Sequence, residues 1–405
     1  MYHPRVIERN IERYEQLKQT KLRRYTVAES KEVTEFLTAK LDNDGRAKKP
    51  WKAYETDFMR NEVALSTLDF RYWAERYATI PRDGVEGGGT GTIRFWDSQE
   101  IALRLIEKIQ ADQLDAADRG EPVDGVLIAF HKARQLGATE LSRLLTMHRM
   151  TLYRDHRCMA ASIDEDKIQE LYDRDKLIFD NLPFFLRPGV GFDVKAEHLY
   201  FDKLNSRILY QQSRQQSGVG QGRQFELAHL TECSSWENAS IMIEMQFFPT
   251  LPQSPHTLAI LESTANGRGN WWHEFTERVR LKKAIQWHYL FIPWYAESKK
   301  YRRKPPENWE PSELSMLHAQ KVFETSPEFV GKQVLLSKEQ LYWYETTRSQ
   351  YAEAGTLNIF LTNWCATPEE SFQHSNVSAF PPEFLEKARL AASAAKAVPY
   401  HMEFN

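Results

Sequence analysis

Between residues 126 and 290, short apolar segments alternate with longer amphipathic ones. Five segments have the length and composition of strands, namely 126–130, 157–162, 206–211, 225–230 and 257–262. Apolar residues at helical spacing follow several of them, at 140–150, 164–179, 237–245 and 270–280. This alternation is typical of a mainly parallel sheet with helices on both faces, so we expect an α/β fold. Such sheets bind ligands at the carboxyl ends of their strands.

The regions on either side are mainly helical in pattern. Residues 1–60 contain an apolar stripe at helical spacing and a polar linker at 43–50, whereas the glycines of 84–91 indicate a flexible loop. Further helices are expected at 65–77, 313–324 and 338–348. We therefore expect a helical N-terminal arm and linker at 1–60, a core at 61–290, and a small lid or linker region at 291–405.

Composition excludes several classes of protein. No apolar run in the 405 residues approaches the roughly 20 needed to cross a bilayer, and the polar first 15 residues do not resemble a signal peptide. The cysteines Cys158, Cys233 and Cys365 form no CxxC pair, which favours a reducing compartment. The net charge of −3 does not suit a protein that coats nucleic acid by bulk charge, so any contact with DNA must come from a local patch or from several subunits.

The segment after the first strand resembles a phosphate loop. An ordinary loop of this kind reads GxxxxGK[ST], in which backbone amides surround phosphate, the lysine contacts the outer phosphates and the hydroxyl binds magnesium. With Gly137 as the second glycine, Thr139 takes the hydroxyl position and opens a helix whose N-terminus favours an anion. The residues expected to contact nucleotide are Lys132, Ala133, Arg134, Gln135, Leu136, Gly137, Ala138, Thr139 and Glu140.

The lysine of the ordinary loop is displaced in this sequence. Ala138 stands at its usual position, and Lys132 stands where the first glycine would be, at the end of the strand. From there a four-carbon side chain could reach the same phosphates. A charged strand-to-helix turn with no ligand would explain the same residues. The string KARQLGAT, however, resembles the shifted-lysine phosphate loop of the large terminase subunit of tailed bacteriophages.

Two later segments resemble that family in the expected order. Residues 225–232 read FELAHLTE, in which Glu232 fits the acid that orients the attacking water in phosphate-loop ATPases. Thr231 replaces the aspartate that organises magnesium, so it could act on the metal through a water. Ser263 and Thr264 directly follow a strand and match the terminase segment that couples hydrolysis to movement. A solvent-facing glutamate and a simple turn are the alternatives.

Further polar residues complete the candidate site. The loop at 211–224 contains Arg214 and Arg223, either of which could stabilise charge on the transferred phosphoryl group, within a subunit or across a subunit boundary. A solvated basic loop that touches DNA explains them equally well. Gln99, beside Phe95 and Trp96, resembles the terminase glutamine next to adenine, although a helix cap at this point explains part of the segment.

The resemblance covers roughly residues 65–380 and implies an ATPase of the phosphate-loop NTPase fold that uses ATP and Mg²⁺. It implies that subunits form a homo-oligomeric ring on the portal protein, with the small terminase subunit as a further partner, and drive double-stranded DNA into a procapsid in the cytoplasm of the infected bacterium. Large terminases usually carry a C-terminal nuclease whose acidic residues we do not find here, so we expect no DNA cleavage. The alternatives are a helicase-like motor and a non-catalytic nucleotide-binding scaffold.

Overall fold

The computed structural model describes residues 22–82, 88–189, 198–213, 220, 222–372, 387–388 and 391. The described residues divide into two compact units. Unit 1 takes its residues from Met1–Phe130, Gly137–Ser263 and Thr276–Tyr289, and unit 2 from His131–Leu136, Thr264–Phe275 and Leu290–Asn405. The expected stripe at residues 6–17 lies outside the described residues, and the three-region division of the chain stays a prediction.

The principal sheet has seven strands among the described residues, in the order β5-β6-β4-β7-β8-β3-β9. Their bounds are β3 Val126–Lys132, β4 Arg157–Ser162, β5 His198–Phe201, β6 Ser206–Gln212, β7 Leu227–Thr231, β8 Leu258–Ser263 and β9 His288–Ile292. The pairs β4–β6, β4–β7 and β7–β8 are parallel, and β5–β6 is antiparallel. The expected mainly parallel sheet is therefore confirmed.

The central strands are buried along their whole length. Every residue of β7 and β8 is buried, as is all of β3 except Lys132. A strand that is covered on both faces needs a nearly continuous apolar run, and these sequences supply one. Glu262 in β8 and His229 in β7 are the polar exceptions among β7 and β8 residues that lie mid-strand.

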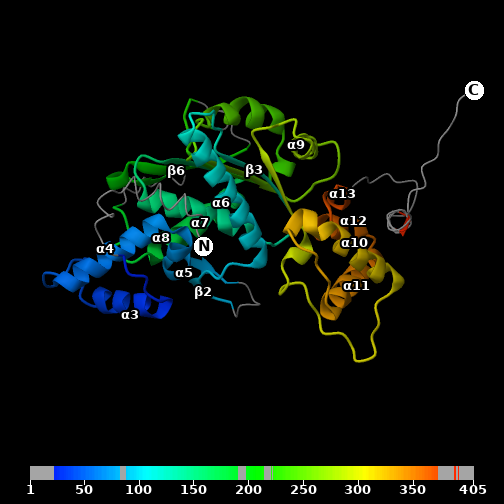
Figure 1. The fold of residues 1–405 in the computed structure, drawn as a ribbon, viewed down its shortest axis with the longest axis horizontal. Helices are drawn as coiled ribbons and strands as arrows, with labels where there is room; N and C mark the ends of the chain where they lie inside the picture. Colours follow the sequence, from blue (N-terminus) through cyan, green and yellow to red (C-terminus); the bar gives the residue numbers. More distant parts are fainter. Residues whose placement is uncertain are drawn as a thin grey trace, which may run out of the picture. The chain divides into compact units, whose positions relative to one another are not determined.

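Helices flank the sheet in unit 1 (Figure 1). The α-helices assigned wholly or partly to this unit are α3 Val27–Thr38, α4 Ala53–Leu68, α5 Phe70–Tyr77, α6 Asp97–Asp118, α7 Ala138–Leu152, α8 Glu165–Asn181 and α9 Trp271–Arg280. Short helical turns are η2 Asp202–Leu204, η3 Cys233–Ser235, η4 Ser240–Phe247 and η5 Phe248–Thr250. Strands β1 Thr79–Pro81 and β2 Thr90–Thr92 form a separate antiparallel pair.

Several expected elements differ from the structure. The helix predicted at 65–77 is two helices, because Asp69 adopts an extended conformation and its side chain caps Tyr72. The helix predicted at 237–245 is the π-helix η4. Within the glycine-rich segment 84–91, Thr90 already belongs to β2, and residues 83–87 lie outside the described residues. Strands β5 and β9 were not predicted.

Unit 2 has a helical core. Its elements include η6 Trp294–Ala296, α10 Glu313–Val330, α11 Lys338–Glu353, α12 Leu357–Asn363 and α13 Pro368–Ser371. Aromatic rings fill the space between them: His318 stacks on Tyr344 at 3.8 Å, and Trp294 lies 5.0 Å from Trp343. In the part of the chain that the structure describes, no helix has a stretch long and apolar enough to cross a membrane.

Candidate functional site

The start of α7 has a geometry that favours glycine. Gly137 precedes the helix with a left-handed backbone (φ +71°), and a Cβ atom there would lie 2.5 Å from Gln99 Nε2. That nitrogen donates to the Gly137 carbonyl at 3.0 Å, and Gln99 Oε1 accepts from the Trp96 backbone at 3.0 Å. Gln99 is therefore buried and holds the backbone at the helix start. Its contact with adenine stays a prediction.

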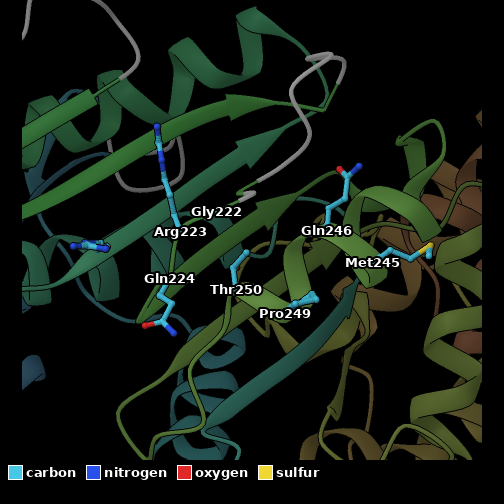
Figure 2. Close-up of a pocket in the computed structure, with 8 residues that line it drawn as sticks. Gly222, Arg223, Gln224, Met245, Gln246, Pro249 and Thr250 are labelled. Carbon is cyan, nitrogen blue, oxygen red and sulfur yellow. The ribbon is translucent and has the colours of Figure 1, made fainter.

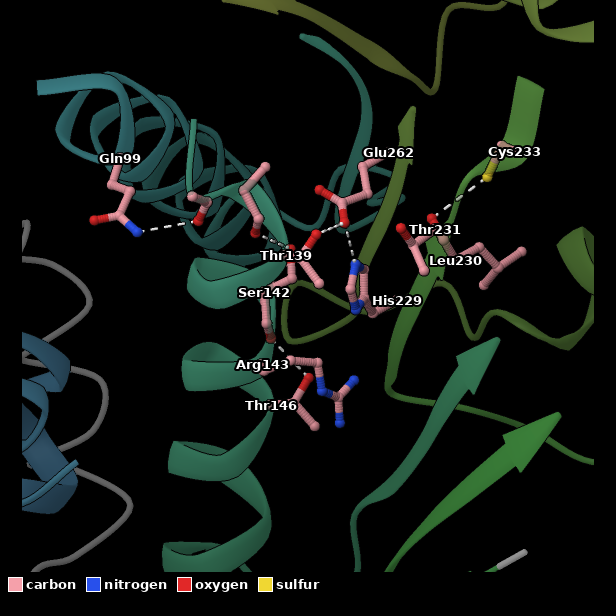
Figure 3. A network of polar contacts seen from close by, with 12 residues as sticks. Gln99, Thr139, Ser142, Arg143, Thr146, His229, Leu230, Thr231, Cys233 and Glu262 are labelled. Carbon is pink, nitrogen blue, oxygen red and sulfur yellow. Dashed lines mark hydrogen bonds and ion pairs between the residues drawn. The ribbon is translucent and has the colours of Figure 1, made fainter. Parts of the chain in front are cut away.

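Thr139, in the first turn of α7, is bonded to a carboxylate that the motif did not indicate. Its hydroxyl donates to Glu262 Oε1 at 2.5 Å, and His229 Nε2 lies 3.1 Å from the same oxygen (Figure 3). Burial lowers the pKa of His229, so the neutral ring donates its Nε2 proton to the carboxylate. Glu262 has no exposed surface. The sequence signal was an acid directly after the apolar run LAIL of the strand LAILES, since charged residues are rarely buried.

Glu232 follows directly on β7, at the carboxyl end of the strand. Its φ of +56° is uncommon for a residue with a side chain. The turn after it is fixed at both ends. Trp236 Nε1 donates to the Thr231 carbonyl at 3.0 Å, and Ser234 N donates to Ser263 Oγ at 3.1 Å.

Thr231 and Ser263 are both buried. The Ser263 hydroxyl also donates to Ser234 Oγ at 2.8 Å, so it contacts the turn that carries Glu232. Their expected roles toward metal and phosphate stay predictions, as does that of Thr264, which belongs to unit 2.

The first half of the loop is anchored within unit 2. Ala133 N donates to Ile292 O at 2.9 Å, Arg134 N donates to Asn363 O at 2.7 Å, and the Tyr301 hydroxyl donates to Arg134 O at 2.5 Å. Arg134 and Gln135 are exposed, Leu136 is buried and Lys132 is half-buried. The chain passes from unit 2 to unit 1 between Leu136 and Gly137. The reach of Lys132 toward phosphate stays a prediction.

Glu140, Arg143 and Arg174 belong to a buried polar network behind the loop. Arg174 bonds to Glu140, and burial raises the pKa of that carboxyl. Arg143, without exposed surface, pairs with Asp175, which also accepts a 2.5 Å bond from the Tyr210 hydroxyl. Glu140 thus joins α7 to α8, and its contact with nucleotide remains a prediction.

The two candidate arginines differ in what the structure describes. Arg214 lies outside the described residues. Arg223 is exposed and, with Arg157 and Gln224, lines a pocket of about 450 Å³ near the amino ends of β4 and β7 (Figure 2). The five residues of β7, spanning about 17 Å at ~3.3 Å each, separate that end from Glu232. This position does not suit Arg223 for action on phosphate held beside Glu232 of its own chain, and action across a subunit boundary stays a prediction.

The oxygen atoms of Thr139 and Glu262, near the carboxyl ends of the strands, are of the kind that binds magnesium. They are too few to hold a metal ion that takes all its ligands from protein. Among the described residues, no group of three or more His, Cys, Asp and Glu side chains could hold a metal ion. Magnesium commonly uses one or two protein oxygens and completes its shell with water and substrate phosphates. The Thr139 hydroxyl beside the Glu262 carboxylate offers this type of hard oxygen group.

A mostly parallel sheet, with a helix that starts at a left-handed glycine and a threonine hydroxyl in its first turn, defines an α/β fold of the phosphate-loop NTPase class. No family model and no curated protein matches the sequence. The chain is similar to solved structures of phage large terminases. One is the large terminase of bacteriophage HK97, with 9% identity and a TM-score of 0.41 over 84% of this chain.

Two further structures of this kind are similar to the chain. The large terminase ATPase domain of Thermus phage P74-26 has 13% identity and a TM-score of 0.38, over 59% of this chain and 87% of that one. The large terminase of another thermophilic bacteriophage has 12% identity and a TM-score of 0.33, over 57% of this chain and 53% of that one. The chain spans 55% of the length of the HK97 protein.

Proposed function

We propose that the chain is the ATP-hydrolysing motor of a viral DNA-packaging terminase. The observation that supports this most is the position of Thr139: its hydroxyl lies in the first turn of α7, directly after the left-handed Gly137, and bonds to a buried carboxylate of β8. A helix N-terminus with free amides favours an anion. Glu232 follows the neighbouring parallel strand β7, at the edge where such sheets bind ligands.

Each residue has a distinct part in the proposed reaction. The loop amides from Gln135 to Thr139 and the Lys132 ammonium hold the phosphates, because the Ala133 and Arg134 amides already donate to Ile292 O and Asn363 O. The Thr139 hydroxyl binds magnesium. Magnesium, when bound, neutralises charge on the outer phosphates. Glu232 accepts a hydrogen bond from the attacking water and aligns it with the outer phosphate. Because Ser263 bonds to the turn after Glu232, it is suited to pass the state of the nucleotide to that carboxylate.

The proposal is tested by phosphate release from ATP. Glu232→Gln should keep binding of a fluorescent ATP analogue and lower turnover by about 10²-fold or more, since proton-accepting side chains contribute on this order. Lys132→Ala should weaken both binding and turnover. Glu237→Gln and Lys283→Ala, which change exposed side chains, are the matched controls. Equal turnover in wild type and all four variants would contradict a catalytic role for this site. The chain would then be a non-catalytic nucleotide-binding scaffold, the alternative that Ala138 and Thr231 favour.

Action on DNA is a separate part of the proposal. We propose double-stranded DNA, a portal protein and the small terminase subunit as partners of a ring of these chains. Exposed basic side chains at Lys299, Arg302 and Lys304 in unit 2 offer a local patch for phosphate despite the net charge of −3. Turnover should rise with duplex DNA without release of a displaced strand. Strand displacement by the purified chain would instead indicate the helicase-like motor.

A further inference from the structure

Glu262 is a buried carboxylate in contact with the proposed magnesium ligand. It lies one residue before the end of β8, has no exposed surface, and its Oε1 atom accepts the Thr139 hydroxyl proton at 2.5 Å. His229, two residues before Thr231 on β7, lies 3.1 Å from the same oxygen and is a second hydrogen-bond partner of the carboxylate (Figure 3). All four residues belong to unit 1, between Gly137 and Ser263.

The strand register places this carboxylate beside the position where the motif lacks one. Thr231 and Glu262 are partners in the parallel pairing of β7 with β8. Partner residues on adjacent parallel strands point to the same face of the sheet and lie about 5 Å apart. The aspartate expected at 231 is therefore missing from β7, while a carboxylate is present on the same face one strand away.

The hydrogen bond gives this carboxylate a chemical task. A threonine hydroxyl has one proton and two lone pairs, and it can bind a metal ion only through a lone pair. When the Thr139 hydroxyl donates its hydrogen bond to Glu262, the lone pairs of the hydroxyl oxygen remain available to bind a cation. The nearby negative charge also strengthens the attraction for a divalent cation, because such charges act strongly in a buried site.

We infer that Glu262 is the positioning carboxylate of the magnesium site, acting through the Thr139 hydroxyl in place of an aspartate at position 231. This inference rests on the proposed ATPase function. Glu262 does not touch the substrate. It sets the direction of the hydroxyl, and His229 sets the direction of the carboxylate. The site then needs no acid at 231, which explains how Thr231 can stand there.

The test measures how much Mg²⁺ strengthens binding of a non-hydrolysable fluorescent ATP analogue to the full chain. Affinity is titrated with Mg²⁺ and with EDTA for wild type, Glu262→Gln and Thr139→Val. Loss of a residue that orients a metal ligand typically costs about 10- to 100-fold in metal affinity. We expect both variants to lose the Mg²⁺-dependent part of the affinity by at least about tenfold, and to keep the affinity in EDTA within about twofold.

Glu62→Gln is the matched control. Glu62 also has no exposed surface and accepts hydroxyl protons, from Tyr72 and Tyr77, but lies in α4. A purely structural role of buried carboxylates would give Glu62→Gln and Glu262→Gln the same profile, with lower thermal stability and an unchanged Mg²⁺ response. Restoration of the response by Thr231→Asp in the Glu262→Gln background would support the inference directly, because it returns a carboxylate to the adjacent strand.

The outcomes separate the inference from the proposed function. If wild type binds the analogue in a Mg²⁺-dependent way and Glu262→Gln shows the same Mg²⁺ dependence, the inference is overturned and the proposed function is not. Wild type that binds no analogue overturns both. Should Glu262→Gln not fold, Glu262→Asp keeps the buried charge and withdraws it by one methylene. It should show the same loss, and an undiminished Mg²⁺ response in that variant would also overturn the inference.

Discussion

Gly137 combines a left-handed backbone with a close neighbour. A side chain at this position would be strained by the φ of +71°, and its Cβ atom would lie 2.5 Å from Gln99 Nε2. Gly120, after α6, has a similar φ of +69° with nothing within 4 Å of an added Cβ. A comparison of substitutions at Gly137 and Gly120 therefore distinguishes the cost of backbone strain from the cost of the steric contact with Gln99.

We expect Gly137→Ala to lower the free energy of unfolding more than Gly120→Ala. Both changes place alanine in a left-handed conformation, which costs about 1–2 kcal/mol. Only the first pushes Gln99 away, for roughly a further 1–3 kcal/mol. Urea denaturation of both variants measures the difference, and Gln99→Ala should remove it. Equal losses would show that the Gln99 contact yields without cost.

At the scale of elements, helix α7 is fixed to its surroundings by buried polar groups. Arg143 joins it to α8 through Asp175, and Asp175 in turn accepts the Tyr210 hydroxyl of β6. On the other side, His148 Nε2 donates to the Ser66 carbonyl of α4 at 2.7 Å. These contacts hold the helix that carries Thr139 against the sheet.

Removal of one partner of the buried ion pair should be costly. We expect Arg143→Met to lower the free energy of unfolding by about 3–5 kcal/mol, since Asp175 is left as an unpaired buried charge. The double variant Arg143→Met/Asp175→Leu should recover much of this loss. Lys176→Met, which breaks the exposed pair with Asp180, should cost less than about 1 kcal/mol. If urea denaturation gave Arg143→Met the same free energy of unfolding as Arg143→Met/Asp175→Leu, the unpaired Asp175 charge would not be the cause of the loss.

His148 should make stability depend on pH. Burial lowers its pKa to about 4 in the folded chain, from the ordinary 6.5. The unfolded chain therefore binds the proton more readily, so the neutral ring stabilises the fold fully above pH 6.5, and this contribution is lost as pH falls toward 4. Between pH 7 and pH 5 the loss is roughly 2 kcal/mol.

The measurement is Tm against pH for wild type and His148→Phe, which keeps the ring contacts with Phe70 and Trp73. The variant should show a flatter decline between pH 6.5 and pH 5. Parallel curves for the two proteins would mean that His148 is not held neutral by the fold.

At the scale of the molecule, the start of the segment at residues 132–139 is held by residues far along the chain. In unit 2, hydrogen bonds join Ile292, Tyr301 and Asn363 to the backbone of Ala133 or Arg134. The region after residue 290, expected to be only a lid or linker, therefore holds the beginning of the loop. Its aromatic core gives these contacts a packed support.

Tyr301→Phe should weaken ATP binding while leaving the fold intact. It removes the 2.5 Å bond to the Arg134 carbonyl, worth ~1 kcal/mol, so KM for ATP should rise roughly fivefold with little change in kcat. Tyr342→Phe on α11 is the control. An unchanged KM in Tyr301→Phe would show that the loop keeps its conformation without this anchor.

Much of the fold follows from local pattern. The strands β3, β4, β6, β7 and β8 were predicted within two residues of their observed ends, because apolar spacing and length are properties of a segment by itself. The short antiparallel β5 and the strand β9 were missed. β5 has only four residues, whereas β9 reads HYLFI before Pro293, a short apolar run that by length and composition fits a strand. The break at Asp69 was also missed, because the apolar spacing continues through it while the side chain caps the next helix.

By itself the sequence determined the class of fold, the loop at 132–139 and the acid that follows β7, since each is a local run of residues with its own chemistry. Tertiary structure alone decided the partners. Glu262 meets Thr139 across 123 residues of chain, and Tyr301 meets Arg134 across 167. Such meetings depend on strand order and register, which place residues side by side regardless of their distance along the chain, so no local spacing encodes them.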